Sequence, residues 1–276
     1  MALYIQTNVS SMEAQKNLGF NQSALQLSFN RLSSGFRINS AKDDAAGLAI
    51  SESLKSQIRS FTVAERNAGD GISMAQTAEG ALGEVHNILG RMRELTVQAA
   101  NGSLTSTDRD FLQTEFLQLQ TEIGRIQGSA KFNGRALVGS TTEDITLQVG
   151  LNDDPNDQIG VTLGGVSLSS VSGTSAALSG TGATSALGSL QIIDDAISSV
   201  SVARSKFGAA MNRLEAAQSN IATMRLNLSA ANSRIRDVDV ANETSQMSRN
   251  QVLSQAGLSV LAQANQLPQL ALGLLQ

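Results

Sequence analysis

Cysteine and tryptophan are absent from this 276-residue chain. The lack of cysteine excludes disulfide bonds, thiolate metal ligands and thiol nucleophiles, and it leaves the redox compartment open. Aromatic residues make up only 3% of the chain, which argues against stacking platforms for bases or sugars. The formal net charge of -4 at pH 7 argues against nucleic acid as a partner.

Long apolar runs are absent too. No stretch approaches the roughly 20 apolar residues that a membrane-spanning helix needs, so we expect no membrane span. The first residues, MALYIQTNVSSMEAQKNL, do not place an apolar core after a basic region, so we expect no cleavable signal peptide. Taken alone, these patterns favour a cytoplasmic protein, but they are compatible with export by a machinery that reads no cleavable signal.

What the chain does contain is a long heptad repeat towards its C-terminal end. Every a and d position is apolar, and many of these positions are alanine. Such a seam predicts a long helix, and one helix cannot bury it alone, so the chain or a second chain must supply a partner of similar length. The seam consists of Ile193, Ala196, Val200, Ala203, Phe207, Ala210, Leu214, Ala217, Ile221, Met224, Leu228, Ala231, Ile235 and Val238.

The N-terminal half supplies a matching seam, interrupted only by Gln57 and Thr96. A shorter third repeat follows it. Together the repeats predict a mainly α fold, a long coiled-coil or helical-bundle rod, with a small β-hairpin region in the centre of the chain. The second seam is Leu54, Phe61, Ala64, Ala68, Gly71, Ala75, Ala78, Leu82, Val85, Leu89, Met92 and Ala99, and the third is Leu112, Phe116, Leu119, Ile123 and Ile126.

The ends of the helices carry their own signals. Gly35 is expected to stop a first helix, and Ser40 with Asp43 resembles a capping box for the second. Ser106 or Thr107 is expected to cap the third helix, and the last long helix is expected to start near Leu190. A C-terminal helix is expected from about residue 242, and Pro268 is expected to end or kink it.

Between residues 139 and 188 the apolar period changes to two. Alternating apolar residues flank the turn sequence NDDPND, which predicts a β-hairpin with one buried face. Val166 and Leu168 suggest a further short strand. The alternating residues are Ile145, Leu147, Val149 and Leu151 before the turn, and Ile159, Val161 and Leu163 after it.

Three features could suggest chemistry, but each has a simpler structural interpretation. His86 is the only histidine, and Val85 and Asn87 beside it are not metal ligands. The NDDPND segment lacks the spacing of a calcium loop and favours a turn. Gly69 and Gly71 follow no strand, so close helix packing explains them better than phosphate binding. We therefore expect no enzyme activity, no metal and no cofactor.

Several longer motifs resemble bacterial flagellin, the subunit of the flagellar filament. Off-seam residues such as Arg31, Arg37 and Asn67 belong to these motifs, and accidental likeness between coiled coils would not reproduce them. The N-terminal motifs are RLSSGFRINSAKDDAAGLAIS at 31–51, ERNAGDGISMAQTAEGAL at 65–82, RMRELTVQAANG at 91–102 and FNGRAL at 132–137. The C-terminal motifs are RSKFGAAMNRLEAAQSNI at 204–221, SRIRDVDVANE at 233–243 and SVLAQANQLPQLALGLL at 259–275.

The resemblance implies a division into two parts, called D0 and D1 in that family. D0 would combine an N-terminal helix, 1–39, with a C-terminal helix, 239–276. D1 would comprise long helices at 40–138, a β-hairpin and loop at 139–188, and a long helix at 189–238. The outer domains of many family members have no counterpart here, because residues 139–188 are too few to form one.

The resemblance also implies a function and partners. We expect a structural subunit that polymerises into the flagellar filament used for swimming, extracellular and exported without a cleavable signal peptide through the flagellar type III apparatus. Implied partners are other copies of the chain, an export chaperone, the filament cap, the hook–filament junction proteins and the Toll-like flagellin receptor of a host. Two alternatives stay open: a hook–filament junction protein, and a cytoplasmic coiled-coil scaffold.

Two sets of site residues follow from the resemblance. The first is an apolar assembly seam in the terminal helices: Leu18, Leu25, Phe29, Leu32, Val260, Leu261 and Leu267. The second is a surface for contact between subunits or with the innate receptor: Arg91, Leu95, Gln98 and Glu115.

Overall fold

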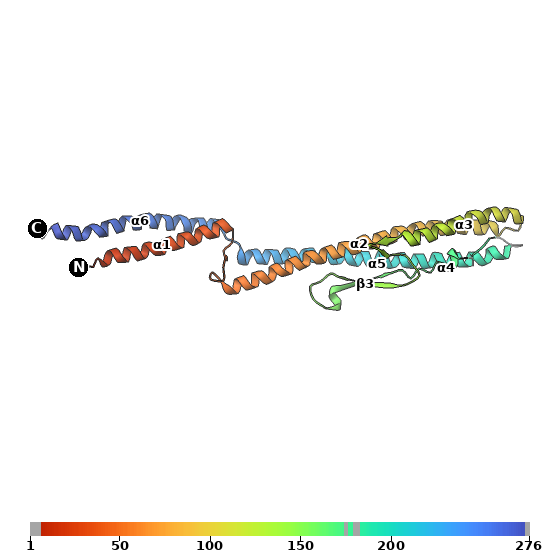
Figure 1. The fold of residues 1–276 in the computed structure, drawn as a ribbon, viewed down its shortest axis with the longest axis horizontal. Helices are drawn as coiled ribbons and strands as arrows, with labels where there is room; N and C mark the ends of the chain where they lie inside the picture. The colour runs from red at the N-terminus through yellow and green to blue at the C-terminus, as the bar shows by residue number, and fades with distance from the viewer. Residues whose placement is uncertain (1–6, 174–175, 179–182, 274–276) are drawn as a thin grey trace. The chain divides into compact units, whose positions relative to one another are not determined.

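The computed structural model describes residues 7–173, 176–178 and 183–273, with side chains for all of these except 172, 183–184 and 267–273. Its packing divides the chain into two units, residues 1–56 with 227–276 and residues 57–226, which we call the terminal unit and the central unit. The helices, labelled in Figure 1, are α1 (Val9–Ser34), α2 (Ala45–Ala99), α3 (Ser106–Ser129), α4 (Ser169–Ser172), α5 (Ala183–Arg236) and α6 (Val240–Gly273). The strands are β1 (Lys131–Phe132), β2 (Arg135–Ala136), β3 (Glu143–Gln148) and β4 (Gln158–Leu163), and η1 (Pro155–Asp157) is a 3-10 turn.

The core of the central unit is the antiparallel contact between α2 and α5. The predicted seam residues are buried from Phe61 to Ala99 on α2 and, apart from half-buried Ala217, from Ile193 to Ile221 on α5. Ion pairs flank the seam and fix its direction: Arg204 contacts Glu79 at 2.6 Å, and Arg93 contacts Asp194 at 2.7 Å. The sequence correctly predicted these two helices as partners within one chain.

The limits of the α5 seam differ from those expected. The helix begins at Ala183 rather than near Leu190, and it ends at Arg236, so Val238 lies in the connector that follows. Beyond Ile221 the seam is only partly covered: Met224 is 44% exposed, and Leu228, Ala231 and Ile235 are half-buried. A heptad pattern gives the face that a helix can bury, but it does not give how much of that face the rest of the chain covers.

Helix α3 packs through buried Phe116 and Ile123, with Leu112, Leu119 and Ile126 half-buried. Its N-cap is Thr105, one residue before the predicted Ser106 or Thr107. The Thr105 hydroxyl accepts from the backbone N–H of Asp108, and the Asp108 carboxylate accepts from the Thr105 N–H at 2.9 Å, which completes a capping box. The Thr105 hydroxyl also donates to the Asp108 carboxylate at 2.7 Å, and this bond, followed by the one from the Thr105 N–H, lowers the pKa of Asp108.

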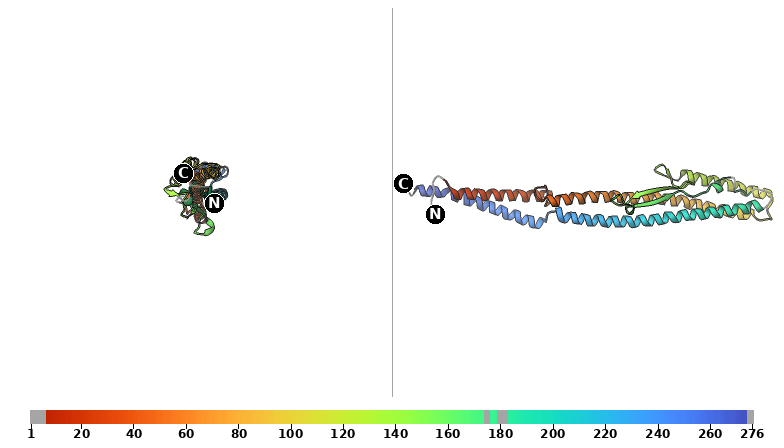
Figure 2. Two further views of the ribbon diagram at one scale, coloured as in Figure 1. Left: turned by 90° about the vertical axis from the view of Figure 1, so that its right-hand side faces the viewer. Right: turned by 90° about the horizontal axis from the view of Figure 1, so that it is seen from below.

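The predicted hairpin is present as the antiparallel pair β3–β4, with Ile145 opposite Val161 and Leu147 opposite Ile159. Figures 1 and 2 show it lying along α2 and α5. The Leu147 side chain packs against Gly71 on α2, and Asn67 Nδ2 donates to the Gln148 carbonyl at 3.0 Å. The hairpin is therefore held to α2 in two ways: Leu147 fills the space that Gly71 leaves, and the Asn67 side chain bonds to the hairpin backbone.

Two further features of this region differ from the sequence analysis. Val166 and Leu168 are buried but form no strand, because Gly164 and Gly165, at φ 69° and 73°, turn the backbone out of the extended conformation. A second hairpin, β1–β2, was not predicted from FNGRAL. Asn133 and Gly134, at φ 50° and 81°, form its two-residue turn.

In the terminal unit, α1 and α6 lie side by side (Figure 1). Gly35 ends α1 as predicted, at φ 73°, and its N–H donates to the Arg31 carbonyl. The predicted capping box at Ser40 and Asp43 forms a turn before the helix instead. The carboxylate of Asp44 accepts from Gly47 N–H at 2.8 Å at the start of α2. Helix α6 continues through Pro268 to Gly273, so Pro268 does not end the helix, and the alternative of a kink there stays a prediction.

The close approach at Gly71 generates a stability prediction. A Cβ at residue 71 would collide with the Leu147 side chain and lie 3.1 Å from Leu214 Cδ1. We expect Gly71→Val to lower the free energy of unfolding by about 1–3 kcal/mol, because overpacking displaces the hairpin. Urea unfolding followed by circular dichroism measures this, and hydrogen exchange of the β3–β4 amides reports the hairpin.

Gly80 is the matched control on the same helix, because no atom lies within 4 Å of the position of its Cβ. Gly80→Ala should raise the free energy of unfolding by up to about 1 kcal/mol through helix propensity. Equal changes in the two variants would contradict the proposed role of Gly71.

Candidate functional site

The terminal helix pair carries the first set of expected site residues. Leu18 is buried between the helices, while Leu25, Leu32 and Leu261 are half-buried. Phe29 and Val260 are exposed, each at 54%. The side chain of Leu267 lies outside the described residues. The expected seam therefore splits into an inner part, which joins α1 to α6, and an outer part.

Polar side chains also join α1 to α6. Asn8 Nδ2 donates to the Ala264 carbonyl at 2.7 Å, and Ser11 Oγ donates to Asn265 Oδ1 at 2.8 Å. Further along, Leu18 lies beside Gly257. These contacts set the antiparallel register of the pair, and the apolar pattern of the sequence did not reveal them because Asn and Ser occur throughout both helices.

Large apolar side chains are exposed on the surface of this pair, along both helices. Soluble monomers seldom leave large apolar patches uncovered. These residues are Val9, Met12, Phe20, Leu27 and Phe29 on α1 and Val240, Val252, Leu253, Leu258 and Val260 on α6. We call this set the outer apolar surface.

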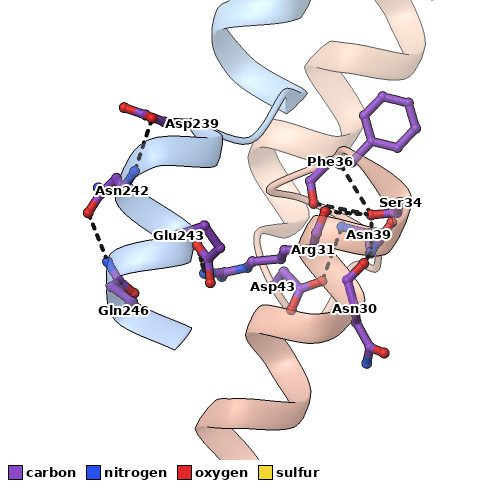
Figure 3. A network of polar contacts seen from close by, with 10 residues as sticks. All are labelled: Asn30, Arg31, Ser34, Phe36, Asn39, Asp43, Asp239, Asn242, Glu243 and Gln246. Carbon is purple, nitrogen blue, oxygen red and sulfur yellow. Dashed lines mark hydrogen bonds and ion pairs between the residues drawn. The ribbon is translucent and has the colours of Figure 1, made fainter. Parts of the chain in front are cut away.

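A polar network lies at one end of the helix pair (Figure 3). Arg31 Nη1 of α1 lies 3.6 Å from Glu243 Oε2 of α6, and Glu243 is only 6% exposed. Among the described residues, neither Arg31 Nε nor Glu243 Oε1 has a hydrogen-bond partner. A buried pair with incomplete hydrogen bonding adds little net stability, but removing one partner would leave an uncompensated charge.

Asp43 organises the connector beside Arg31 (Figure 3). Its carboxylate accepts from the backbone N–H of Ser40 at 2.9 Å, from the Ser40 hydroxyl at 3.0 Å and from Asn39 N–H at 3.2 Å. These bonds, with the Ser40 backbone first, hold the pKa of Asp43 below its usual range. A polar pocket of about 400 Å³ opens here, lined by Leu27, Asn30, Arg31, Ser33, Ser34, Asn39, Ser40 and Asp43.

The two connectors of the terminal unit are bonded to each other. Arg37 N–H donates to the Arg236 carbonyl at 2.6 Å, and Val238 N–H donates to the Gly35 carbonyl at 3.0 Å. The Arg236 guanidinium lies 4.6 Å from the centre of the Phe36 ring and contacts Glu52 at 2.7 Å. These motif residues thus make contacts inside the chain.

The second set of expected site residues lies on the central unit. Arg91 on α2 contacts both Glu115 on α3 and Glu94, each at 2.9 Å. The hydrogen bond to Glu115, followed by that to Glu94, raises the pKa of Arg91. Arg91 and Gln98 are exposed and Glu115 is half-exposed, but Leu95 is only 1% exposed. Leu95 belongs to the helical core, so its placement on a surface is wrong for this structure.

Of the candidates for chemistry, Gly71 and the NDDPND segment have structural roles. Gly69 has no atom within 4 Å of its Cβ position, and His86 Nδ1 is buried with no hydrogen-bond partner among the described residues. Asp154 accepts from Asn156 N–H at 2.8 Å, and Asp157 accepts from Asn152 N–H at 2.8 Å, so NDDPND forms the predicted turn. In the described part of the chain, no three His, Asp or Glu side chains gather as a metal site. The helices in that part also include none with the length and apolar character needed to cross a bilayer.

Both ends of the chain match models of a known protein family. The model of the bacterial flagellin N-terminal helical region matches residues 5–142, and that of the C-terminal helical region matches residues 190–275. The flagellin of Halalkalibacterium halodurans is 46% identical over 274 residues, covering 99% of this chain and 100% of that protein. The flagellin of Bacillus subtilis is 40% identical over 304 residues, covering 99% of each.

A solved structure agrees in fold. A protein from Vibrio parahaemolyticus, described as flagellar hook-associated, matches with a TM-score of 0.59 at 16% identity, covering 71% of this chain and 100% of that one. This likeness shows the fold alone, whereas the two relatives that match nearly end to end are named flagellin. The chain therefore belongs to the bacterial flagellins, the structural subunits of the flagellar filament.

Proposed function

We propose that this flagellin polymerises by burying the outer apolar surface of its terminal helix pair against other copies of the chain. The observation that carries the proposal is the exposure of large apolar side chains, such as Phe29 and Val260, on helices already paired with each other. Contact between α1 and α6 buries only the residues on their facing sides. A further partner is needed to cover the outer apolar surface.

Typical magnitudes are consistent with a persistent polymer. Burying one Val, Leu or Phe side chain contributes about 1.5–3 kcal/mol, whereas association costs about 4–15 kcal/mol of lost freedom and ordering. A few such side chains therefore offset the cost, and α1 and α6 expose more than a few. An open helical polymer requires that one part of this surface binds a different part on the next copy, because contact between identical patches closes as a pair. Exposed apolar side chains on both α1 and α6 supply two such parts.

The division of the chain into parts is included in this proposal. We assign 1–39 and 239–276 to the assembling part, D0, and 40–138, 139–188 and 189–238 to D1. The packing of the isolated chain groups residues differently, with its limits at 56/57 and 226/227. The end of α5 packs with the connector residues Phe36 and Arg37, and the start of α2 packs with that end of α5. The D0 limits instead follow the connectors at Gly35 and Val238.

Further binding partners are assigned to the same helices and surfaces. We assign α6 to an export chaperone, because an amphipathic helix with an apolar face suits a helix-binding groove. Export without a cleavable signal peptide through the flagellar type III apparatus, and contacts with the filament cap and hook–filament junction proteins, belong to the same proposal. Arg91, Gln98 and Glu115 are assigned to contact between subunits and to a host Toll-like flagellin receptor.

Val260→Asp tests polymerisation more sharply than a change at half-buried Leu261, because Val260 is 54% exposed and its loss spares the contact between α1 and α6. We expect the variant to fold but not to elongate filament seeds, since burial of an unpaired carboxylate costs several kcal/mol. Electron microscopy of seeded growth measures filament length, and thermal unfolding measures folding.

Thr121→Asp places the same charge at an exposed position of α3, outside the outer apolar surface, and should elongate normally. Val260→Thr replaces a methyl group with a hydroxyl group without adding charge and should raise the critical concentration only moderately. Filaments of normal length from Val260→Asp would contradict the assignment of this surface.

The chaperone assignment predicts which helix is required for binding. A chain without residues 240–276 should lose binding to the export chaperone, whereas a chain without residues 1–39 should keep it, because α6 remains available. A pull-down with purified chaperone distinguishes the two. Retained binding by the first truncation would refute the placement on α6.

The receptor assignment rests on the exposed guanidinium of Arg91. Removing a charge-assisted hydrogen bond costs about 1.5–3 kcal/mol, so Arg91→Ala should weaken receptor activation by the monomer roughly tenfold or more. Arg125→Ala is the control, because Arg125 is an exposed arginine of α3 paired with Glu122 at 2.7 Å. Equal loss in both variants, measured in a reporter-cell assay, would remove the assignment.

A further inference from the structure

The turn between α2 and α3 contains a chemically labile pair, Asn101 followed by Gly102. Both residues are exposed. Because glycine has no side chain, its backbone nitrogen is the least shielded nucleophile that can follow an asparagine. The space around this nitrogen is open too, since no atom lies within 4 Å of the position of a Cβ on Gly102.

The asparagine side chain is held by a hydrogen bond to the residue that follows Gly102. Ser103 N–H donates to Asn101 Oδ1 at 3.1 Å. This bond closes a ring that contains both the side-chain carbonyl carbon of Asn101 and the backbone nitrogen of Gly102. It also polarises the carbonyl and would stabilise negative charge developing on Oδ1, as the donors of an oxyanion hole do.

We propose that Asn101 is a site of spontaneous covalent modification through a cyclic imide. The Gly102 nitrogen forms a bond to Cγ of Asn101 and loses its proton to solvent base, the bond between Cγ and Nδ2 breaks, and ammonia leaves with a proton from water. Water then adds to either carbonyl of the imide. One ring opening gives aspartate, and the other gives isoaspartate, with an extra methylene in the main chain.

Asn133 and Gly134 provide an internal comparison, because they form the same dipeptide in a different setting. Asn133 has φ 50°, and the pair Phe132 and Arg135 closes the strands on both sides of the turn. Bringing the Gly134 nitrogen onto Cγ of Asn133 requires rotating a backbone held by this pairing. The native chain should therefore modify residue 101 in preference to residue 133.

Modification at residue 101 has a structural consequence. The Asn101 carbonyl accepts from Arg109 Nη2 at 3.0 Å, and Arg109 Nε donates to the Ala99 carbonyl at 2.9 Å. Arg109 is only 6% exposed, so these carbonyls partner a buried cation at the end of α2. An extra methylene at residue 101 displaces one of them. The isoaspartyl chain should thus unfold at a lower temperature.

The test is to age the full-length chain in mildly alkaline buffer made with ¹⁸O-labelled water, and to map its peptides by mass spectrometry. We expect labelled aspartyl and isoaspartyl products at residue 101 several-fold faster than at residue 133 in the native chain. In concentrated urea the two rates should become similar. Equal rates in the native chain, or faster reaction at residue 133, would overturn the proposal.

Gly102→Val is the matched variant, because the open space at this position lets the chain fold with a side chain there. Its unfolding temperature should match that of the parent, and modification at residue 101 should fall several-fold while that at residue 133 stays the same. Unchanged modification at residue 101 would overturn the proposal. Asn101→Asp adds the charge without the methylene, so its unfolding temperature should exceed that of the isoaspartyl chain.

Discussion

The antiparallel contact between α2 and α5 is the constraint on which the rest of the chain depends. It joins residues far apart in sequence, as the bonds from Arg204 to Glu79 and from Ser51 to Asn232 show. Small residues such as Ala68 and Gly71 on α2 let larger side chains approach, among them Leu214 from α5 and Leu147 from the hairpin. Because the two helices are antiparallel, the connectors at Gly35 and Val238 meet and bond to each other.

Much of this arrangement could be predicted from the sequence, because it depends on periodicity. The heptad spacing from Ile193 to Ile221 identified the buried face of α5, and alternation around Leu147 identified the β3–β4 hairpin. Gly35 ended α1 as expected, since a left-handed residue is needed there. The off-seam motif residues identified the family, which periodicity alone could not do.

The wrong predictions concern two things that a local sequence pattern does not give: which side chains are buried, and which partners the polar side chains bind. Leu95 sits beside exposed Arg91 in the motif, yet α2 turns it into the core. Asp44, not Ser40, bonds to the first turn of α2, since Ser40 and Asp43 are used in the connector. The turn at Asn133 and Gly134 carried a recognisable hairpin signal, but its strands are only two residues long each. The outer apolar surface could be identified only from the structure, because α1 carries apolar residues on both faces and the sequence does not show which of them are exposed.

The bond between Asn8 and Ala264 joins residues 256 positions apart, close to the whole length of the chain. Helix α1 is synthesised first, but its partner α6 is synthesised last. During translation, α1 therefore cannot pair with α6 until the segments between them have been made, and the loop that must close is long. The order of synthesis thus delays the moment at which a polymerisation-competent subunit exists.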